Sequence, residues 1–286
     1  TDPTRWATGY DFPAVKDGRI AMEKVAQRSP APTAGFAFNT RRKIFEDPRV
    51  REALAMAFDF EWANANLFAN AYQRTYGYYS GSELSSRGIP AHGREKAVLG
   101  DAANTLRPEF LDGTYQLPVT DGSGRDRKVL RKVVGLLGEA GWTVTDGGLV
   151  NAAGEQFAFT ISVQNKDQEK IALHFQRTLK AIGIAADVRL VDAAQFAAIQ
   201  KTYDYDMIPA TWFNSLSPGN EQVFYFGSEG RSAEGTRNYP GIADPAVDRA
   251  IKAMLDAKSR EDFVAAVRAE DRLLVSGFYI VPFYDA

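Results

Sequence analysis

Apolar residues recur every three or four positions in four stretches of the chain, and each stretch carries a helix boundary signal. The segment DPRVREALAMAF predicts a helix that starts after Asp47 with Pro48 in its first turn, because Asp is a good N-cap and proline is tolerated there. DPAVDRAIKAML and SREDFVAAVRAEDRLL predict helices capped at Asp244 and Ser259. RKVVGLLGEAGW predicts a helix that stops at Gly141, since glycine favours the backbone conformation common just after a helix.

Strand and helix patterns alternate in the middle of the chain. Strands are predicted at 157–163, 184–191 and 205–212, with helices between them at 167–183 and 193–201. This order and these lengths predict an α/β fold, with right-handed crossovers and a sheet flanked by helices. The stretch GGLVNAAGEQ predicts a hairpin before the first of these strands.

A long segment, from residue 72 to about residue 125, lacks a clear helical or strand pattern and is rich in proline and glycine. Such a stretch is uncommon within a compact domain unless it is functional or covers another surface. We expect it to pack over the domain or to face a partner surface.

Composition excludes several classes of function. The 286 residues carry 34 basic and 36 acidic side chains, a formal charge of -2, so nothing favours nucleic acid or an anionic membrane. There is no cysteine, and His92 and His174 are the two histidines. Thiol chemistry is therefore absent, and no spacing typical of a metal site occurs. We expect neither a metal nor a cofactor.

Catalytic motifs are also lacking. The serine in GYYSG stands one place too late for a nucleophile elbow, and DGSGRD fits neither nucleotide-binding glycine motif. Carboxylates cluster at helix starts, where capping explains them. A pair of acids from distant segments stays open, but nothing in the sequence argues for one, and we expect a protein that is not an enzyme.

The stretch ATWFNSLSPGNEQVFYF, residues 210–226, is the strongest candidate for a binding site. It follows a predicted strand, and ligands of open α/β sheets lie beyond the carboxyl ends of strands. Trp212 is either core or a ligand contact, whereas core is the favoured reading for residues 224–226. Arg41 either lies in a solvated turn, the favoured reading, or pairs with a ligand carboxylate.

Several segments resemble one known family along nearly the whole chain. FAFNTRRKIFEDPRVREALAMAFD resembles the extracellular solute-binding proteins of the peptide, nickel and opine class, family 5, in which an Asn follows a strand and a DxRVRxAL helix comes next. LLGEAGW and GGLVNAAGEQFAFTI extend the match. SLSPGNEQVFYFGS with GTRNYPGIADPAVDRAI resembles the YejA-like branch, which is associated with oligopeptide and microcin C uptake.

The resemblance implies a periplasmic binding protein type II fold, with residues 1–286 as the large C-terminal lobe of a two-lobed clamp. The chain would then be a fragment, and the segment from residue 72 to 125 would cover the lobe or face the missing one. The whole protein would be a monomeric periplasmic component of an ABC importer that binds oligopeptides or peptide-like compounds, including murein peptides, and hands them to a membrane permease. Opines or oligosaccharides are alternative ligands, and a cell-wall peptide hydrolase is the disfavoured alternative.

Family members that bind oligopeptides carry a Trp-x-x-Asp pattern whose aspartate holds the ligand's amino terminus. Trp212 matches this pattern, but Ser215 occupies the aspartate position, so Glu221 is the nearest carboxylate that would substitute for it. The candidate ligand-binding residues are Trp212, Phe213, Asn214, Ser215, Asn220, Glu221, Arg41 and Tyr79.

Overall fold

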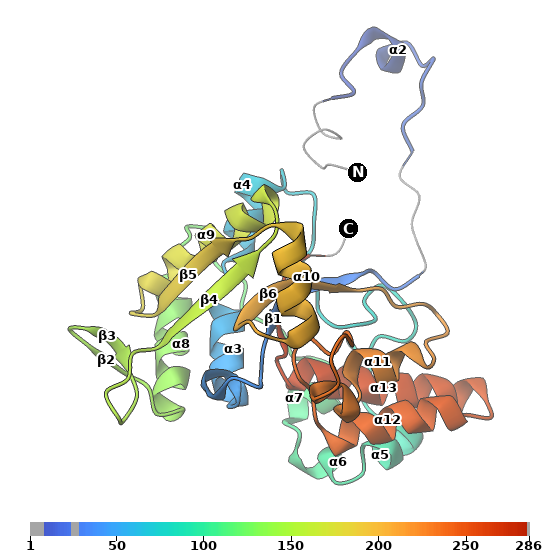
Figure 1. Ribbon diagram of the computed structural model, residues 1–286. Helices are drawn as coiled ribbons and strands as arrows, with labels where there is room; N and C mark the ends of the chain where they lie inside the picture. The colour runs from blue at the N-terminus through green and yellow to red at the C-terminus, as the bar shows by residue number, and fades with distance from the viewer. Residues whose placement is uncertain (1–8, 24–28, 285–286) are drawn as a thin grey trace.

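Five strands form one mixed sheet in the computed structural model, which describes residues 9–23 and 29–284. Across the sheet the order is β5-β4-β6-β1-β7 (Figure 1). The strands are β1 (Thr33–Phe38), β4 (Ala158–Val163), β5 (Ala185–Leu190), β6 (Met207–Trp212) and β7 (Ile280–Pro282). The three strands predicted in the middle of the chain are confirmed, each one or two residues shorter than expected.

The strand directions bring several chain segments to one edge of the sheet. β4 runs parallel to β5 and β6, whereas β1 runs antiparallel to both β6 and β7. In the register, Thr33 lies opposite Trp212 and Gly35 lies opposite Pro282. The start of β1 therefore shares an edge with the carboxyl ends of β4, β5, β6 and β7.

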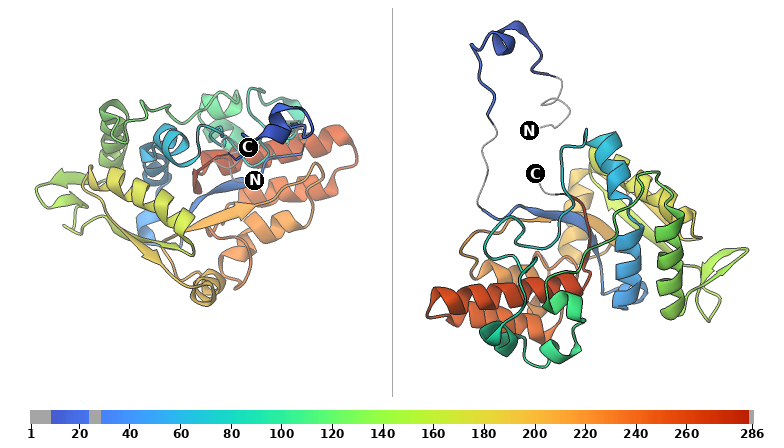
Figure 2. Two further views of the ribbon diagram at one scale, coloured as in Figure 1. Left: turned by 90° about the horizontal axis from the view of Figure 1, so that it is seen from above. Right: turned by 180° about the vertical axis from the view of Figure 1, so that it is seen from behind.

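Helices cover both faces of the sheet and give the domain two apolar cores (Figures 1 and 2). Phe36 and Phe38 point into the core formed with α3 (Pro48–Ala57), α8 (Arg127–Glu139) and α9 (Lys166–Lys180). Ala37 belongs to the opposite core, formed with α10 (Ala193–Thr202), α12 (Pro245–Asp256) and α13 (Arg260–Ser276). This alternation follows from the two-residue period of a strand.

Shorter elements complete the chain. They are α2 (Pro13–Lys16), α4 (Phe60–Leu67), α5 (Gly93–Leu99), α6 (Ala102–Thr105), α7 (Pro108–Leu111), α11 (Glu221–Phe226), the 3₁₀ helices η1 (Lys43–Phe45) and η2 (Ser228–Arg231), and the hairpin strands β2 (Thr143–Thr145) and β3 (Gly148–Val150). The predicted hairpin is confirmed, with β2 and β3 paired antiparallel. None of the described helices has the length and apolar character needed to cross a bilayer.

The predicted helix boundaries are confirmed in detail. The Asp47 and Asp244 side chains accept hydrogen bonds from the first-turn amides of α3 and α12, and Pro48 and Pro245 occupy their first positions. Ser259 Oγ accepts from the Asp262 amide at the start of α13. α8 ends at Glu139, and Gly141 follows with a φ of 91°.

The long segment from residue 72 to 125 is not irregular throughout, so that expectation was wrong. It contains α5, α6 and α7, and it packs against α13. The Asp271 carboxylate of α13 accepts hydrogen bonds from the backbone amides of Tyr78 (2.8 Å) and Ser86 (2.9 Å). The buried Arg272 pairs with Glu95 of α5. Polar side chains of α13 thus satisfy backbone and charged groups of a segment that has little regular structure of its own.

Candidate ligand-binding face

A pocket of about 330 Å³ lies at the sheet edge where β4 and β6 end. Three of its polar side chains are glutamines: Gln164 directly follows β4, Gln168 lies in the first turn of α9, and Gln200 lies on α10. An amide side chain offers both donors and an acceptor. The pocket can therefore pair with ligands that, like peptides, carry both kinds of group.

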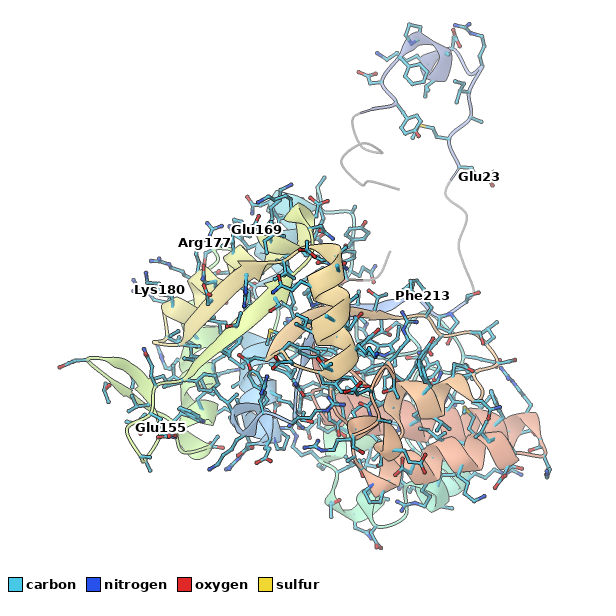
Figure 3. All side chains as sticks on the ribbon, in the orientation of Figure 1. Glu23, Glu155, Glu169, Arg177, Lys180 and Phe213 are labelled. Atoms are coloured by element: carbon cyan, nitrogen blue, oxygen red, sulfur yellow. The ribbon has the colours of Figure 1, made fainter. Side chains whose placement is uncertain are left out.

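The same pocket has an aromatic and a cationic wall. Phe213, the first residue after β6, lines it and leaves 61% of its surface exposed, at the place labelled in Figure 3. Arg237 and Tyr239 also line it. Arg237 Nε donates to the Tyr239 hydroxyl at 3.3 Å, and this bond is the main reason that the pKa of Arg237 is raised. The guanidinium is thus held in place and fully charged.

The loop from 213 to 220 is held by its own polar side chains. Asn214 Nδ2 donates to the Tyr78 carbonyl at 2.9 Å, and Asn214 Oδ1 accepts from Gln222 Nε2 at 2.9 Å. Glu221 Oε1 accepts from the Gly219 amide at 2.9 Å. Ser215 Oγ accepts from the Ser217 amide at 3.0 Å. These contacts fix the loop beside the pocket, and Asn220 is exposed at the start of α11.

Trp212 does not reach the pocket surface, so its expected role as a ligand contact was wrong. Its side chain is 0% exposed and packs among Tyr78, Phe226 and Tyr239, with ring centroids 5.7–6.1 Å apart. Its indole Nε1 donates to the Arg237 carbonyl at 3.1 Å. Trp212 therefore supports the pocket from beneath and belongs to the core.

Tyr79 is also buried, and the expectation that it contacts the ligand was wrong. Its hydroxyl donates to Glu270 Oε2 at 3.0 Å, and the side chain is 0% exposed. The favoured reading of residues 224–226 as core holds for Phe226 and Tyr225 and fails for Phe224, which is 44% exposed.

Arg41 lies neither in a solvated turn nor at a ligand. Its guanidinium stacks on the Tyr203 ring at 3.7 Å. Its nitrogens donate to one side-chain oxygen and to four backbone carbonyls, those of Arg231 (2.6 Å), Gly230, Asn238 and Tyr239. Burial lowers the pKa of Arg41. With its donors occupied, Arg41 ties the end of β1 to the segment around η2 and has no capacity for a ligand carboxylate.

Sequence reasoning missed Gln164, Gln168, Gln200 and Arg237. They come from three separate segments, and within one of them the Gln164 amide donates to Gln168 Oε1 at 3.0 Å. The sequence did contain a signal for Gln164. Ligands of open α/β sheets lie beyond the carboxyl ends of strands, and Gln164 directly follows β4 just as Phe213 follows β6.

Neither histidine lines this pocket. His174 is buried on α9, stacked on Trp62 with ring centroids 4.1 Å apart, and burial lowers its pKa. His92 is exposed just before α5. Within residues 9–23 and 29–284 no three His, Cys, Asp or Glu side chains group in a way that would hold a metal ion.

The chain belongs to the bacterial extracellular solute-binding proteins of family 5, whose middle region matches residues 2–234.

Relatives and a solved structure agree with this assignment. The chain is 48% identical over 284 residues to the peptidoglycan-binding protein YepA of Agrobacterium fabrum, a match that covers 99% of this chain and 46% of YepA. It is 34% identical over 285 residues to YejA of Escherichia coli, covering 99% of this chain and 47% of YejA. The chain therefore spans about half the length of the curated relatives it matches.

The fold matches that of the oligopeptide-binding protein AppA from Bacillus subtilis, solved with a nonapeptide. The TM-score is 0.73 at 20% sequence identity, and the match covers 100% of this chain and 49% of AppA. The expected fold class, a periplasmic binding protein lobe with a mixed sheet flanked by helices, is confirmed, as is the resemblance to family 5.

Proposed function

We propose that this chain is the large C-terminal lobe of a periplasmic solute-binding protein that captures peptides or peptide-like compounds for an ABC importer. The observation that carries the proposal is the pocket at the carboxyl ends of β4 and β6. It combines three glutamine amides, the exposed ring of Phe213 and the charged Arg237. Peptides present amides, apolar side chains and a terminal carboxylate, which these groups match in kind.

The position of the pocket supports a two-lobed mechanism. β1 begins and β7 ends at the edge that holds the pocket. Chain segments that continue to a second lobe from these strands would place that lobe opposite Phe213. Closing the two lobes would bury the ligand, and the complex would then deliver it to the membrane permease.

The relatives narrow the ligand class. YepA is a peptidoglycan-binding protein and AppA binds an oligopeptide. A cell-wall peptide and an oligopeptide both carry amide groups that suit the glutamine-lined pocket. The chain's sequence identity is higher to YepA than to AppA, which favours peptides derived from the cell wall. The ligand's amino terminus would need a partner other than Ser215, because a serine hydroxyl carries no charge. Glu221 remains a candidate for that role, with one carboxylate oxygen engaged by the loop.

Small molecules that copurify with the full-length protein test this proposal. The protein is purified without refolding and then denatured, and the released compounds are identified by mass spectrometry. A set of peptides or muropeptides is expected. A single sugar or opine would keep the transport role and change the ligand class, whereas turnover of a labelled peptide would revive the hydrolase alternative.

A pair of variants then tests the pocket itself. Phe213→Ala should weaken binding of the identified ligand by about 1–3 kcal/mol, the range for an aromatic anchor that a ligand buries. Phe224→Ala is the matched control, because Phe224 is also exposed but does not line the pocket. Equal losses in the two variants, measured by calorimetric titration, would contradict the assignment of this pocket as the ligand site.

A further inference from the structure

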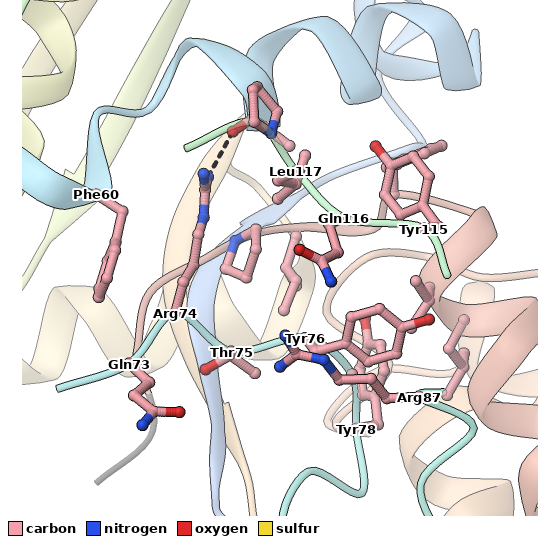
Figure 4. A pocket seen from close by; sticks show the side chains of 18 of the residues that line it. Phe60, Gln73, Arg74, Thr75, Tyr76, Tyr78, Arg87, Tyr115, Gln116 and Leu117 are labelled. Atoms are coloured by element: carbon pink, nitrogen blue, oxygen red, sulfur yellow. Dashed lines mark hydrogen bonds between the residues drawn. The ribbon is translucent and has the colours of Figure 1, made fainter. Parts of the chain in front are cut away.

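A second pocket lies on the opposite side of β1 from β6. It has a volume of about 240 Å³ and is enclosed by the segments 73–78 and 115–119, the end of α13 and β7 (Figure 4). Its walls are mostly apolar, formed by Leu117, Pro118, Leu274, Phe278, Ile280 and Pro282. It shares no residue with the pocket of Phe213 and Arg237.

Arg74 crosses this pocket with most of its hydrogen-bonding capacity unused. Its Nη2 donates to the Ala55 carbonyl at 2.7 Å, the contact drawn as a dashed line in Figure 4. Its Nε and Nη1 are buried, and neither has a hydrogen-bond partner among the described residues. Burial lowers the pKa of Arg74 to about 10, so the guanidinium stays charged at neutral pH. The charges of Glu61 and Asp59 favour the charged guanidinium, but a buried cation whose N–H groups lack an acceptor is still unfavourable.

Two further donors in the same pocket are unpaired. The Thr75 Oγ1 and the Tyr78 hydroxyl are both buried, and both lack a hydrogen-bond partner within the described part of the chain. The three side chains come from one short segment. Unsatisfied buried polar groups are rare in native proteins. The unpaired guanidinium nitrogens of Arg74 in particular indicate that an acceptor group belongs beside this side chain.

The carboxylates around the pocket are engaged elsewhere. Glu61 also lines the pocket, but its Oε2 accepts from the Thr120 amide (3.0 Å) and hydroxyl (2.7 Å). Asp59 accepts from the Trp62 and Gly124 amides and from the Thr120 hydroxyl. No carboxylate within the described ranges forms an ion pair with Arg74. With Arg87 at its edge, the pocket holds two guanidinium groups and one carboxylate.

We propose that this pocket is a binding site for a carboxylate group on a short apolar stem, with the buried guanidinium of Arg74 as its cationic partner. A guanidinium with unused N–H groups favours an anionic acceptor. The apolar walls suit the stem. An apolar cavity of roughly 150 Å³ holds a benzene ring in an engineered protein, so 240 Å³ accommodates a short branched acyl chain.

The carboxylate has two sources, and both carry the same chemistry. It belongs either to a free small molecule or to an acidic side chain from the rest of the full-length protein. The site does not depend on the pocket of Phe213, so it holds whether or not the proposed peptide function is correct.

Titration of the full-length protein with 4-methylpentanoate, and with the neutral 4-methylpentanamide, tests the site. NMR of protein labelled with ¹⁵N-arginine follows the Arg74 Nε–H signal. Saturable shifts with the acid, and binding at least about tenfold weaker with the amide, are expected if the site takes a free carboxylate. If an acidic side chain of the protein fills the site, neither probe binds and a crystal structure of the full-length protein shows that carboxylate on Arg74.

Matched variants separate a binding role from a structural one. Arg74→Gln should weaken binding of 4-methylpentanoate by roughly tenfold to a hundredfold, whereas Arg87→Gln, an exposed cation at the edge of the same pocket, should change it by less than about threefold. Phe213→Ala should leave probe binding unchanged.

The proposal is overturned by either of two results. One is a full-length structure in which water or backbone carbonyls alone satisfy Arg74, together with no response to the acid. The other is equal binding of the acid and the amide. A loss of binding in Phe213→Ala alone would transfer the carboxylate to the first pocket and leave the Arg74 site without support.

Discussion

The side chains of Trp212 and Phe213 are neighbours in sequence and have opposite roles. Trp212 is enclosed by Tyr78, Phe226 and Tyr239, whereas Phe213 is largely exposed at the pocket. Ile208, Ala210 and Trp212 all belong to the core beside α12 and α13, whereas Phe213 follows the last residue of β6 and belongs to neither core of the described chain.

Trp212→Ala should therefore lower the free energy of unfolding by about 3–5 kcal/mol, the range for deleting a buried large aromatic side chain. Phe213→Ala should change it by less than about 0.5 kcal/mol, because little of its surface is buried. Urea unfolding of the two variants checks this prediction. If Trp212→Ala kept its stability but lost ligand affinity, Trp212 would be a ligand contact and not a core residue.

Glu270 predicts a pH dependence of stability. It is fully buried, and burial, with the neighbouring Asp271 and Glu221 charges adding to it, raises its pKa from 4.5 to about 8, although the hydrogen bond from Tyr79 opposes the shift. Between about pH 4.5 and pH 8, the Glu270 carboxyl is therefore protonated in the folded state and ionised in the unfolded state. Stability should fall as pH rises from about 4.5 to about 8 and level off above that.

Glu270→Gln removes this ionisation while keeping an acceptor for the Tyr79 hydroxyl. The variant should be more stable than the parent at pH 9, and the difference should shrink or reverse at pH 5. Burial also raises the pKa of Asp271 and Glu95, so the test is the difference between the two proteins at each pH. A difference in unfolding free energy that does not change with pH would contradict an ionisation at Glu270.

At the scale of helices and strands, the capped helices were the most predictable elements. The start of α13 shows why: Ser259 Oγ accepts from the Asp262 amide at 3.1 Å and donates to Asp262 Oδ2 at 2.7 Å. These two residues are three apart in the sequence, so the signal is local. By contrast, α5, α6 and α7 have four to seven residues each and were missed, because so few residues show no helical period.

Ser259→Ala should lower the free energy of unfolding by about 1 kcal/mol, the usual cost of removing an N-cap side chain. Ser232→Ala is the matched control, since Ser232 is exposed just after η2 and its side chain stands at no helix N-terminus. Chemical denaturation of both variants gives the comparison. Equal stabilities would show that the Asp262 interactions contribute nothing at this helix end.

The candidate site was less predictable than the elements that carry it. Phe213 could be found because it directly follows a recognisable strand. The structural role of Arg41 could not be predicted, because the backbone carbonyls that accept its hydrogen bonds lie about 190 residues further along the chain. The Arg74 pocket was missed for the same reason, since α13, β7 and residues 115–119 enclose it from far away in sequence. Local chemistry is visible in a sequence, whereas contacts made by the fold are not.

On the scale of the whole molecule, the Phe213 pocket is built on one sheet and the helices that cover it. The residues of the Phe213 pocket come from the ends of β4 and β6, from α9 and α10, and from residues 237–239. All of these segments are anchored to one sheet and its helices. A ligand that enters this pocket finds its partners already placed, so little conformational entropy is lost on this side of the interface. In the proposed two-lobed mechanism, the large movement on binding then falls to the junction between the lobes.

The full-length protein should therefore contract when it binds its ligand, and small-angle X-ray scattering should record a smaller radius of gyration. A ligand shifts an open–closed equilibrium only by its preference for the closed state. Phe213→Ala reduces that preference without altering either end state, so the variant should reach the same final radius at a higher ligand concentration. Binding by calorimetry without any contraction would contradict closure as the mechanism. It would leave a lobe that holds its ligand on an open surface.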